Sequence, residues 1–126
     1  MRGLDSNVLV RLLVADDVQQ LQRAQAYVQA NAPCWINRVV LCEVVWVLRR
    51  RYGQSRQRIA AALQTLTEAV EFEIEDAEAV RQGIEALEAG HDFADAVIAS
   101  TNRRRGCDTT ATFDRKAGRL DGFEAL

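Results

Sequence analysis

The chain alternates short strand-like segments with longer amphipathic helical segments along its length. The strand-like runs lie within residues 1–7 and at 34–36, 70–74 and 107–114. Between them, apolar residues recur at the spacing of one helix face, as at Val18, Leu21 and Val28. Strands joined through helices run parallel and are covered by those helices. We therefore predict an α/β protein with a central parallel sheet and helices on both faces.

Several helix ends are marked by capping residues. Asn37 and Ser55 each stand directly before a periodic segment, and their side chains can accept hydrogen bonds from first-turn N–H groups. Gly53 and Gly106 follow the last periodic residues of two helices, where a left-handed backbone is common. Residues 115–120 are expected to form a short helical turn followed by a tail.

Length and composition limit the classes of protein that the chain can belong to. A length of 126 residues predicts one domain, spanning 1–126. The net charge of −2 argues against binding nucleic acid through bulk positive potential. The cysteines are three scattered residues in apolar stretches, which predicts buried free thiols and a cytoplasmic protein: Cys34, Cys42 and Cys107. With one histidine, a histidine-rich metal site is excluded.

Glu43 is the acid that fits its surroundings least well. Its neighbours on a helix would be Val39, Val40, Trp46 and Val47, all apolar, so the sequence predicts no polar face for it. A buried carboxylate is costly unless it is paired, hydrogen-bonded or bound to metal. An arginine partner or a raised pKa is one explanation, and a role in a functional site is the other.

Asp5 and Asp114 each follow a predicted strand. Ligand sites of parallel α/β sheets form beyond the carboxyl ends of the strands. The alternative for both residues is to cap the helix or turn that follows. Thr112 lies two residues before Asp114, on the same face of an extended chain, so its hydroxyl would point toward whatever Asp114 binds.

Asp92 and Asp95 stand at the start of the helix predicted for residues 93–105. Asp92 suits the N-cap position, and Asp95 then occupies the third helical position, as in a capping box. Asp95 also borders the apolar run 96–99, and the helix dipole contributes too little to offset burial of its charge. We therefore expect Asp95 to bind a cation.

A shared site explains four of these acids better than four separate roles: Asp5, Glu43, Asp95 and Asp114. In a parallel sheet covered by helices, the strand exits and the first turns of the helices converge at one edge. Carboxylates without histidine or cysteine form an oxygen site that suits Mg²⁺ or Mn²⁺. Such sites support phosphodiester hydrolysis. Without metal, mutual repulsion should raise the pKa of at least one of the acids.

Four ordered segments resemble the signature segments of the PIN-domain family, and most closely those of VapC-type toxins. They are LDSNVLV at 4–10, CEVVWVLRRRYG at 42–53, DFADAVIA at 92–99 and TFDRKA at 112–117. The resemblance implies a Rossmann-like fold and a Mg²⁺- or Mn²⁺-dependent endoribonuclease. It also implies a homodimer and a cognate antitoxin protein as partner.

The resemblance assigns roles to individual positions. Asp5, Glu43, Asp95 and Asp114 would be the catalytic and metal-binding acids. Asn7, Thr112 and Asp92 would support them. Ser6 stands where many relatives have threonine, so the hydroxyl is kept.

Other features allow two interpretations. The arginine triplets 49–51 and 103–105 end two helices, where they complement the helix dipole or contact RNA phosphates. Trp46 is expected in the core. The alternative to an enzyme is a catalytically inactive PIN-like adaptor that binds RNA or protein. The complete set of acids favours the enzyme.

Overall fold

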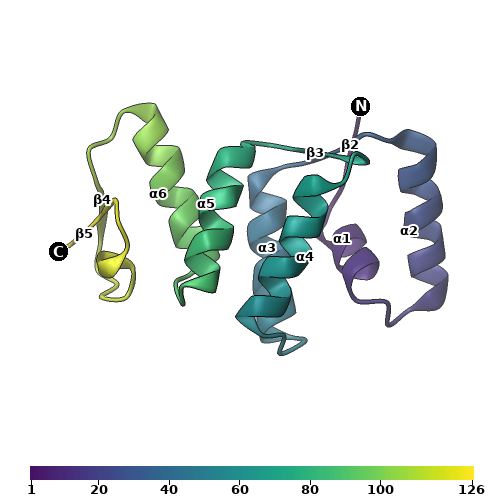
Figure 1. Ribbon diagram of the computed structural model, residues 1–126, viewed down its shortest axis with the longest axis horizontal. Helices are drawn as coiled ribbons and strands as arrows, with labels where there is room; N and C mark the ends of the chain where they lie inside the picture. The colour runs from purple at the N-terminus through teal and green to yellow at the C-terminus, as the bar shows by residue number, and fades with distance from the viewer. The chain divides into compact units, whose positions relative to one another are not determined.

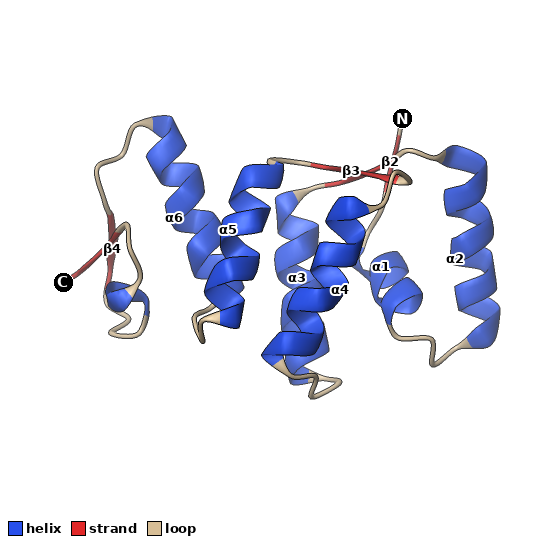
Figure 2. Cartoon of the chain, viewed as in Figure 1, coloured by secondary structure: helices blue, strands red, loops and turns tan.

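The computed structural model describes all residues, 1–126, and comprises two compact units, Met1–Asp76 and Ala77–Leu126. Each unit contains helices and its own small parallel sheet. Figure 1 follows the chain from the amino to the carboxyl terminus, and Figure 2 separates helices from strands. The predicted α/β class, with parallel strands, is confirmed.

The first unit alternates strands and helices as predicted. Its elements are β1 (Arg2–Gly3), α1 (Ser6–Leu13), α2 (Val18–Asn31), β2 (Cys34–Ile36), α3 (Arg38–Arg50), α4 (Arg56–Glu68) and β3 (Phe72–Ile74). The three strands are parallel, in the order β1-β2-β3. The Leu4 N–H donates to the Trp35 carbonyl at 2.9 Å, which continues the pairing of β1 up to the residue before Asp5.

The predicted caps fix where the helices start. The Asn37 side chain accepts from the Val40 N–H at 2.9 Å, and the Ser55 hydroxyl accepts from the Arg58 N–H at 3.1 Å. Gly106 closes α6 (Phe93–Arg105) with a φ of 102°, a left-handed conformation that favours glycine. These local signals place α3 directly after β2, so that the helix carrying Glu43 starts at the carboxyl end of a strand.

Apolar side chains from strands and helices form the core of the first unit. The residues with no exposed surface are Leu9, Cys34, Ile36, Val44, Leu48, Ile59 and Leu63. Cys34 is therefore buried, as predicted. The same prediction was wrong for Cys107, which is exposed, because it follows α6 in a connecting segment and not in a strand.

The second unit consists of α5 (Ala77–Glu88), α6, β4 (Thr110–Thr112), the 3₁₀ helix η1 (Ala117–Arg119) and β5 (Phe123–Ala125). Helices α5 and α6 pack side by side (Figure 1). Gly83 permits this packing, because a Cβ there would lie 2.6 Å from a ring carbon of Phe93. Strand β5 pairs parallel with β4, with Thr112 opposite Ala125. The sequence had indicated only a tail at this position.

None of the helices combines the length and the apolar character that crossing a membrane requires.

Candidate active site

Asp5 stands between β1 and α1 with its carboxylate exposed. Its backbone carbonyl accepts from the N–H groups of Val8 at 3.1 Å and Leu9 at 3.3 Å, which starts the helix. Its side chain makes no capping hydrogen bond. The Asn7 side-chain amide donates to the carboxylate at 3.4 Å. The capping alternative for the Asp5 side chain is therefore wrong, and the carboxylate is available to a ligand.

Glu43 lies on an exposed face of α3. The buried residues of this helix form the opposite face: Val40, Leu41, Val44, Val45 and Leu48. Val39 and Trp46, which are 68% and 58% exposed, share the exposed face with Glu43. The predictions that Glu43 lacks an accessible face and that Trp46 is in the core were wrong. Because both faces of α3 are rich in apolar residues, the periodicity could not identify the buried one.

The Glu43 carboxylate is held by Ser6. The Ser6 hydroxyl donates to Glu43 Oε2 at 2.9 Å, and Ser6 itself is only 7% exposed. The partner of Glu43 is thus a hydroxyl, and not the arginine considered from the sequence. This bond joins the first turn of α1 to α3, next to Asp5. The signal in the sequence was the position of Ser6 directly after Asp5, and no contact with Glu43 was predicted from it.

In the second unit, Asp92 is the N-cap of α6. Its carboxylate accepts from the Asp95 N–H at 3.0 Å, as the capping interpretation predicted. This bond uses the backbone of Asp95 and leaves its side chain unconstrained. Asp95 is half-buried, and the residues that follow it, Ala96 and Val97, are buried. Asp95 therefore lies at the boundary between the exposed start of α6 and its buried residues.

Three effects raise the pKa of the Asp95 carboxyl above its ordinary value. The largest is burial, and the negative charges of Asp92 and then Asp114 add to it. This is the direction expected for a half-buried acid near other acids. Asp114, at the end of β4, therefore acts on Asp95 electrostatically within the second unit.

Asp114 organises the turn that follows β4. Its Oδ1 accepts from the N–H groups of Lys116 at 2.8 Å and Ala117 at 3.3 Å, so the predicted capping of this turn is confirmed. Both bonds use the same oxygen. The Thr112 hydroxyl accepts from the Asp114 N–H at 3.0 Å. Thr112 therefore supports Asp114 through its backbone.

The predicted site residues thus form two local groups. The first unit brings together Asp5, Asn7, Ser6 and Glu43. The second unit brings together Asp92, Asp95, Thr112 and Asp114. No group of three or more His, Cys, Asp or Glu side chains has the spacing to hold a metal ion. The convergence of all four acids at one edge stays a prediction.

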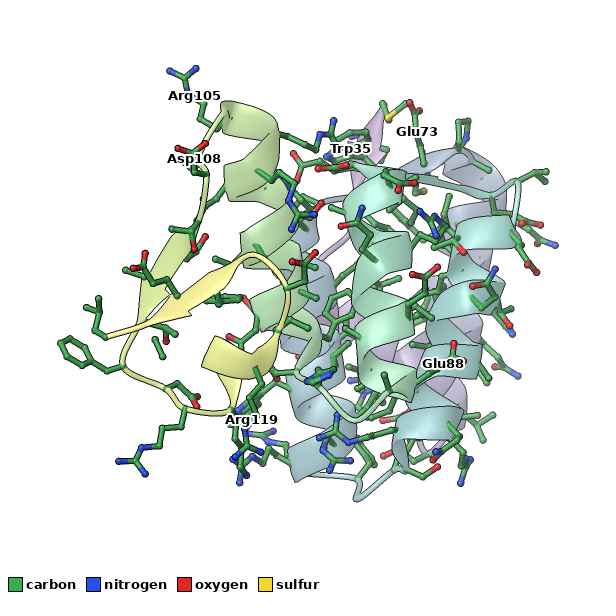
Figure 3. The ribbon with its side chains drawn as sticks, turned by 60° about the vertical axis from the view of Figure 1, so that its left-hand side comes forward. Trp35, Glu73, Glu88, Arg105, Asp108 and Arg119 are labelled. Carbon is green, nitrogen blue, oxygen red and sulfur yellow. The ribbon has the colours of Figure 1, made fainter.

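The arginine triplets are exposed at the ends of α3 and α6. Arg103 also forms an ion pair of 3.3 Å with Asp121. Figure 3 shows Arg105 and Asp108 at one end of the second unit, with Arg119 at the other.

A family model for the PIN domain matches residues 4–122, nearly the whole chain. The chain belongs to the PIN-domain family. The family match spans all four acids of the predicted site, and the parallel α/β architecture agrees with a Rossmann-like PIN fold.

Among solved structures, this PIN domain is similar to Mycobacterium tuberculosis VapC20, described as a Sarcin-Ricin loop cleaving toxin. The identity is 21% and the TM-score 0.46, over 99% of this chain and 98% of that one. A comparison with curated proteins found no match.

Proposed function

We propose that the chain is a Mg²⁺- or Mn²⁺-dependent endoribonuclease and the toxin of a toxin–antitoxin pair. It hydrolyses RNA phosphodiester bonds with water activated by the metal. Its whole length, 1–126, is one functional domain. Membership of the PIN family supports the class of reaction, and the acids at the family's motif positions support an active site.

The observation that carries the proposal is the Asp95 carboxyl, which is half-buried and whose pKa is raised by burial and by the negative charges of Asp92 and Asp114. Packing alone would favour an amide or an apolar residue at this position, because a buried negative charge beside other negative charges is unfavourable. A divalent cation reverses the preference, since it stabilises every carboxylate that it contacts. Asp95 is therefore better explained as a metal ligand than as a structural residue.

The donor chemistry of the two groups fits a hard divalent cation. Asp5, Glu43, Asp95 and Asp114 would hold it through carboxylate oxygens, which Mg²⁺ and Mn²⁺ prefer. A bound Mg²⁺ or Mn²⁺ would supply activation of water and stabilisation of negative charge on the phosphate oxygens. The exposed carboxylates of Asp5 and Glu43 are accessible for this purpose.

The other residues orient these ligands. Ser6 holds Glu43 through its hydroxyl, and Asn7 contacts Asp5 through its amide. Asp92 fixes the first turn of α6, and Thr112 fixes the backbone of Asp114. Pre-oriented ligands lower the reorganisation that accompanies metal binding and catalysis.

The family resemblance extends the proposal to partners and location. The substrate is RNA, and the partner is a cognate antitoxin protein that covers the active site. The chain acts as a homodimer in the cytoplasm.

The test is cleavage of tRNA and total RNA by the purified, antitoxin-free protein, with Mg²⁺, with Mn²⁺ and with EDTA. Asp5→Asn and Asp95→Asn should abolish cutting. Asp108→Asn is the matched control, because Asp108 is an exposed acid in the segment between α6 and β4, outside both groups. Binding of Mn²⁺, measured by calorimetry, should fail in the first two variants and persist in the control.

Two results would contradict the proposal. Cutting that continues in EDTA would exclude the metal mechanism. A folded protein that neither cuts RNA nor binds Mn²⁺ would instead support the inactive adaptor.

A further inference from the structure

Phe113 is among the most exposed apolar residues of the chain, at 86%. Single exposed apolar residues are common and need no explanation by themselves. Val70, 88% exposed, is such a residue and lies in the connection before β3. Phe113 differs because it stands between Thr112 and Asp114, two members of the predicted site. Consecutive Cα atoms are about 3.8 Å apart, so the aromatic ring starts one residue from an acid of that site.

The turn that carries Phe113 is held on both sides by hydrogen bonds. The Asp114 N–H donates to the Thr112 hydroxyl at 3.0 Å, closing a short turn around Phe113. After it, the Asp114 carboxylate accepts from Lys116, and the Asp114 carbonyl accepts from the Gly118 N–H at 2.9 Å. The backbone is therefore organised before any ligand binds, which lowers the entropy lost on binding.

Cationic side chains follow Phe113 in the same turn, after Asp114. Arg115 and Lys116 are both exposed, and Arg119 is exposed one turn later in η1 (Figure 3). In a chain of net charge −2, this is a local concentration of positive charge beside an acidic group. An exposed aromatic ring with adjacent cations is the combination that single-stranded nucleic acids bind, by stacking on the ring and by phosphate contacts.

We propose that Phe113 stacks on an unpaired nucleobase of the RNA substrate, while Arg115 and Lys116 contact the neighbouring phosphates. This inference rests on the proposed ribonuclease function and assigns a substrate-binding subsite to it. Stacking does not require hydrogen bonds to the base edges, so Phe113 supplies affinity and position with little preference among bases. The base must be unstacked to fit, so a paired base at this position is excluded.

The test compares cleavage kinetics of Phe113→Ala, Phe113→Leu and Phe113→Trp, with Val70→Ala as the matched control. Stacking on one base gives the Ala variant a KM for RNA that is raised by roughly 5- to 150-fold, with kcat little changed. Trp should restore the KM, and Leu should not, because Leu is apolar but has no flat ring. Circular dichroism confirms that each variant is folded, as expected for so exposed a position.

A second arm removes one base at a time from the RNA around the mapped cleavage position. For the wild type, one abasic position should raise the KM as much as Phe113→Ala does. Removing that same base should not change the KM of the Ala variant further, because the stacking contact is already lost when either the ring or the base is absent.

The outcomes separate this inference from the proposed function. A wild type that cuts no RNA overturns both. A wild type that cuts, with an unchanged KM in Phe113→Ala or undiminished sensitivity to the abasic position, overturns only the stacking. Unchanged RNA kinetics with weakened binding of an antitoxin would assign the ring to a protein partner, and would also overturn it.

Discussion

The Ser6 hydroxyl donates to Glu43 Oε2 at 2.9 Å, and this bond ties the start of α1 to the middle of α3. The donor is buried and the acceptor is exposed. A fixed, buried donor therefore determines the direction of a carboxylate that would otherwise move freely in solvent. Because Asp5 immediately precedes Ser6, the same short segment supplies one acid and orients another.

Replacing Ser6 by alanine should weaken metal binding more than folding. Hydrogen bonds to charged groups contribute about 1.5–3 kcal/mol, which corresponds to a loss of roughly 10- to 150-fold in Mn²⁺ affinity if the bond persists in the bound state. Stability should change little, since Glu43 remains solvated. Ser6→Thr keeps the hydroxyl and should restore the affinity. Calorimetric titration and thermal melting measure the two effects, and equal Mn²⁺ affinity in Ser6→Ala would show that Glu43 needs no such support.

Asp95→Asn should stabilise the metal-free protein at neutral pH. The folded-state pKa of Asp95 is raised, so between its unfolded and folded pKa values the folded chain binds more protons. The contribution of Asp95 to stability is thus least favourable above the folded pKa, and it improves as the pH falls through that value. The stabilisation by Asn should therefore shrink in acid. Thermal melting at a series of pH values in EDTA tests this, and a gain that grows in acid would contradict it.

Saturating Mn²⁺ should make the wild type more stable than Asp95→Asn, which reverses the order expected without metal. A ligand that binds only the folded state stabilises it by about 2.7 kcal/mol at a hundred times its dissociation constant. Saturating Mn²⁺ should therefore raise the melting temperature of the wild type and leave that of Asp95→Asn unchanged. Mn²⁺ should raise the melting temperature of Asp108→Asn as much as that of the wild type, because Asp108 lies between α6 and β4, outside the predicted site. The same Mn²⁺-induced shift in Asp95→Asn would remove Asp95 from the metal ligands.

Asp92 should show separate effects of its hydrogen bond and its charge. Asp92→Ala removes the cap of α6 and should cost about 1 kcal/mol of unfolding free energy. Asp92→Asn keeps an acceptor for the Asp95 N–H and should cost much less. Both changes remove a negative charge near Asp95 and should lower the pKa of Asp95. Urea denaturation and carboxyl NMR titration measure the two quantities; a pKa of Asp95 that stays unchanged would contradict the charge effect.

Local signals in the sequence predicted the helix starts well, because a cap depends on residues only a few positions apart. The Asn37, Ser55 and Asp92 side chains all make the predicted bonds. The sequence also predicted that the pKa of one acid is raised, but from repulsion between acids, whereas the largest cause at Asp95 is burial. The buried face of α3 could not be predicted from the sequence, because Trp46 and Val44 are both apolar but lie on different faces of the helix.

Long-range relationships were the least predictable from the sequence. Strand β5 has three residues and depends on pairing with β4, so no local pattern marks it strongly. The Ser6–Glu43 bond joins residues that are 37 positions apart, and only the fold brings them together. The convergence of the acids of the two units is of the same kind, and it stays a prediction of the parallel topology.

Gly83→Ala should destabilise the second unit, although alanine is the better helix former. A Cβ at this position would lie 2.6 Å from a ring carbon of Phe93 and 3.2 Å from a methyl group of Val97. The Phe93 ring is 1% exposed and has no space to withdraw. Overpacking of this kind costs about 1–3 kcal/mol, against a gain of about 1 kcal/mol in helix propensity.

Glu88→Ala, at an exposed position of the same helix, is the control. Because Phe93 starts the helix that carries Asp95, the Gly83 variant should also bind Mn²⁺ more weakly. If the Gly83 variant has the same unfolding free energy as the wild type in urea, α5 and α6 can move apart without loss of stability, and the prediction is wrong.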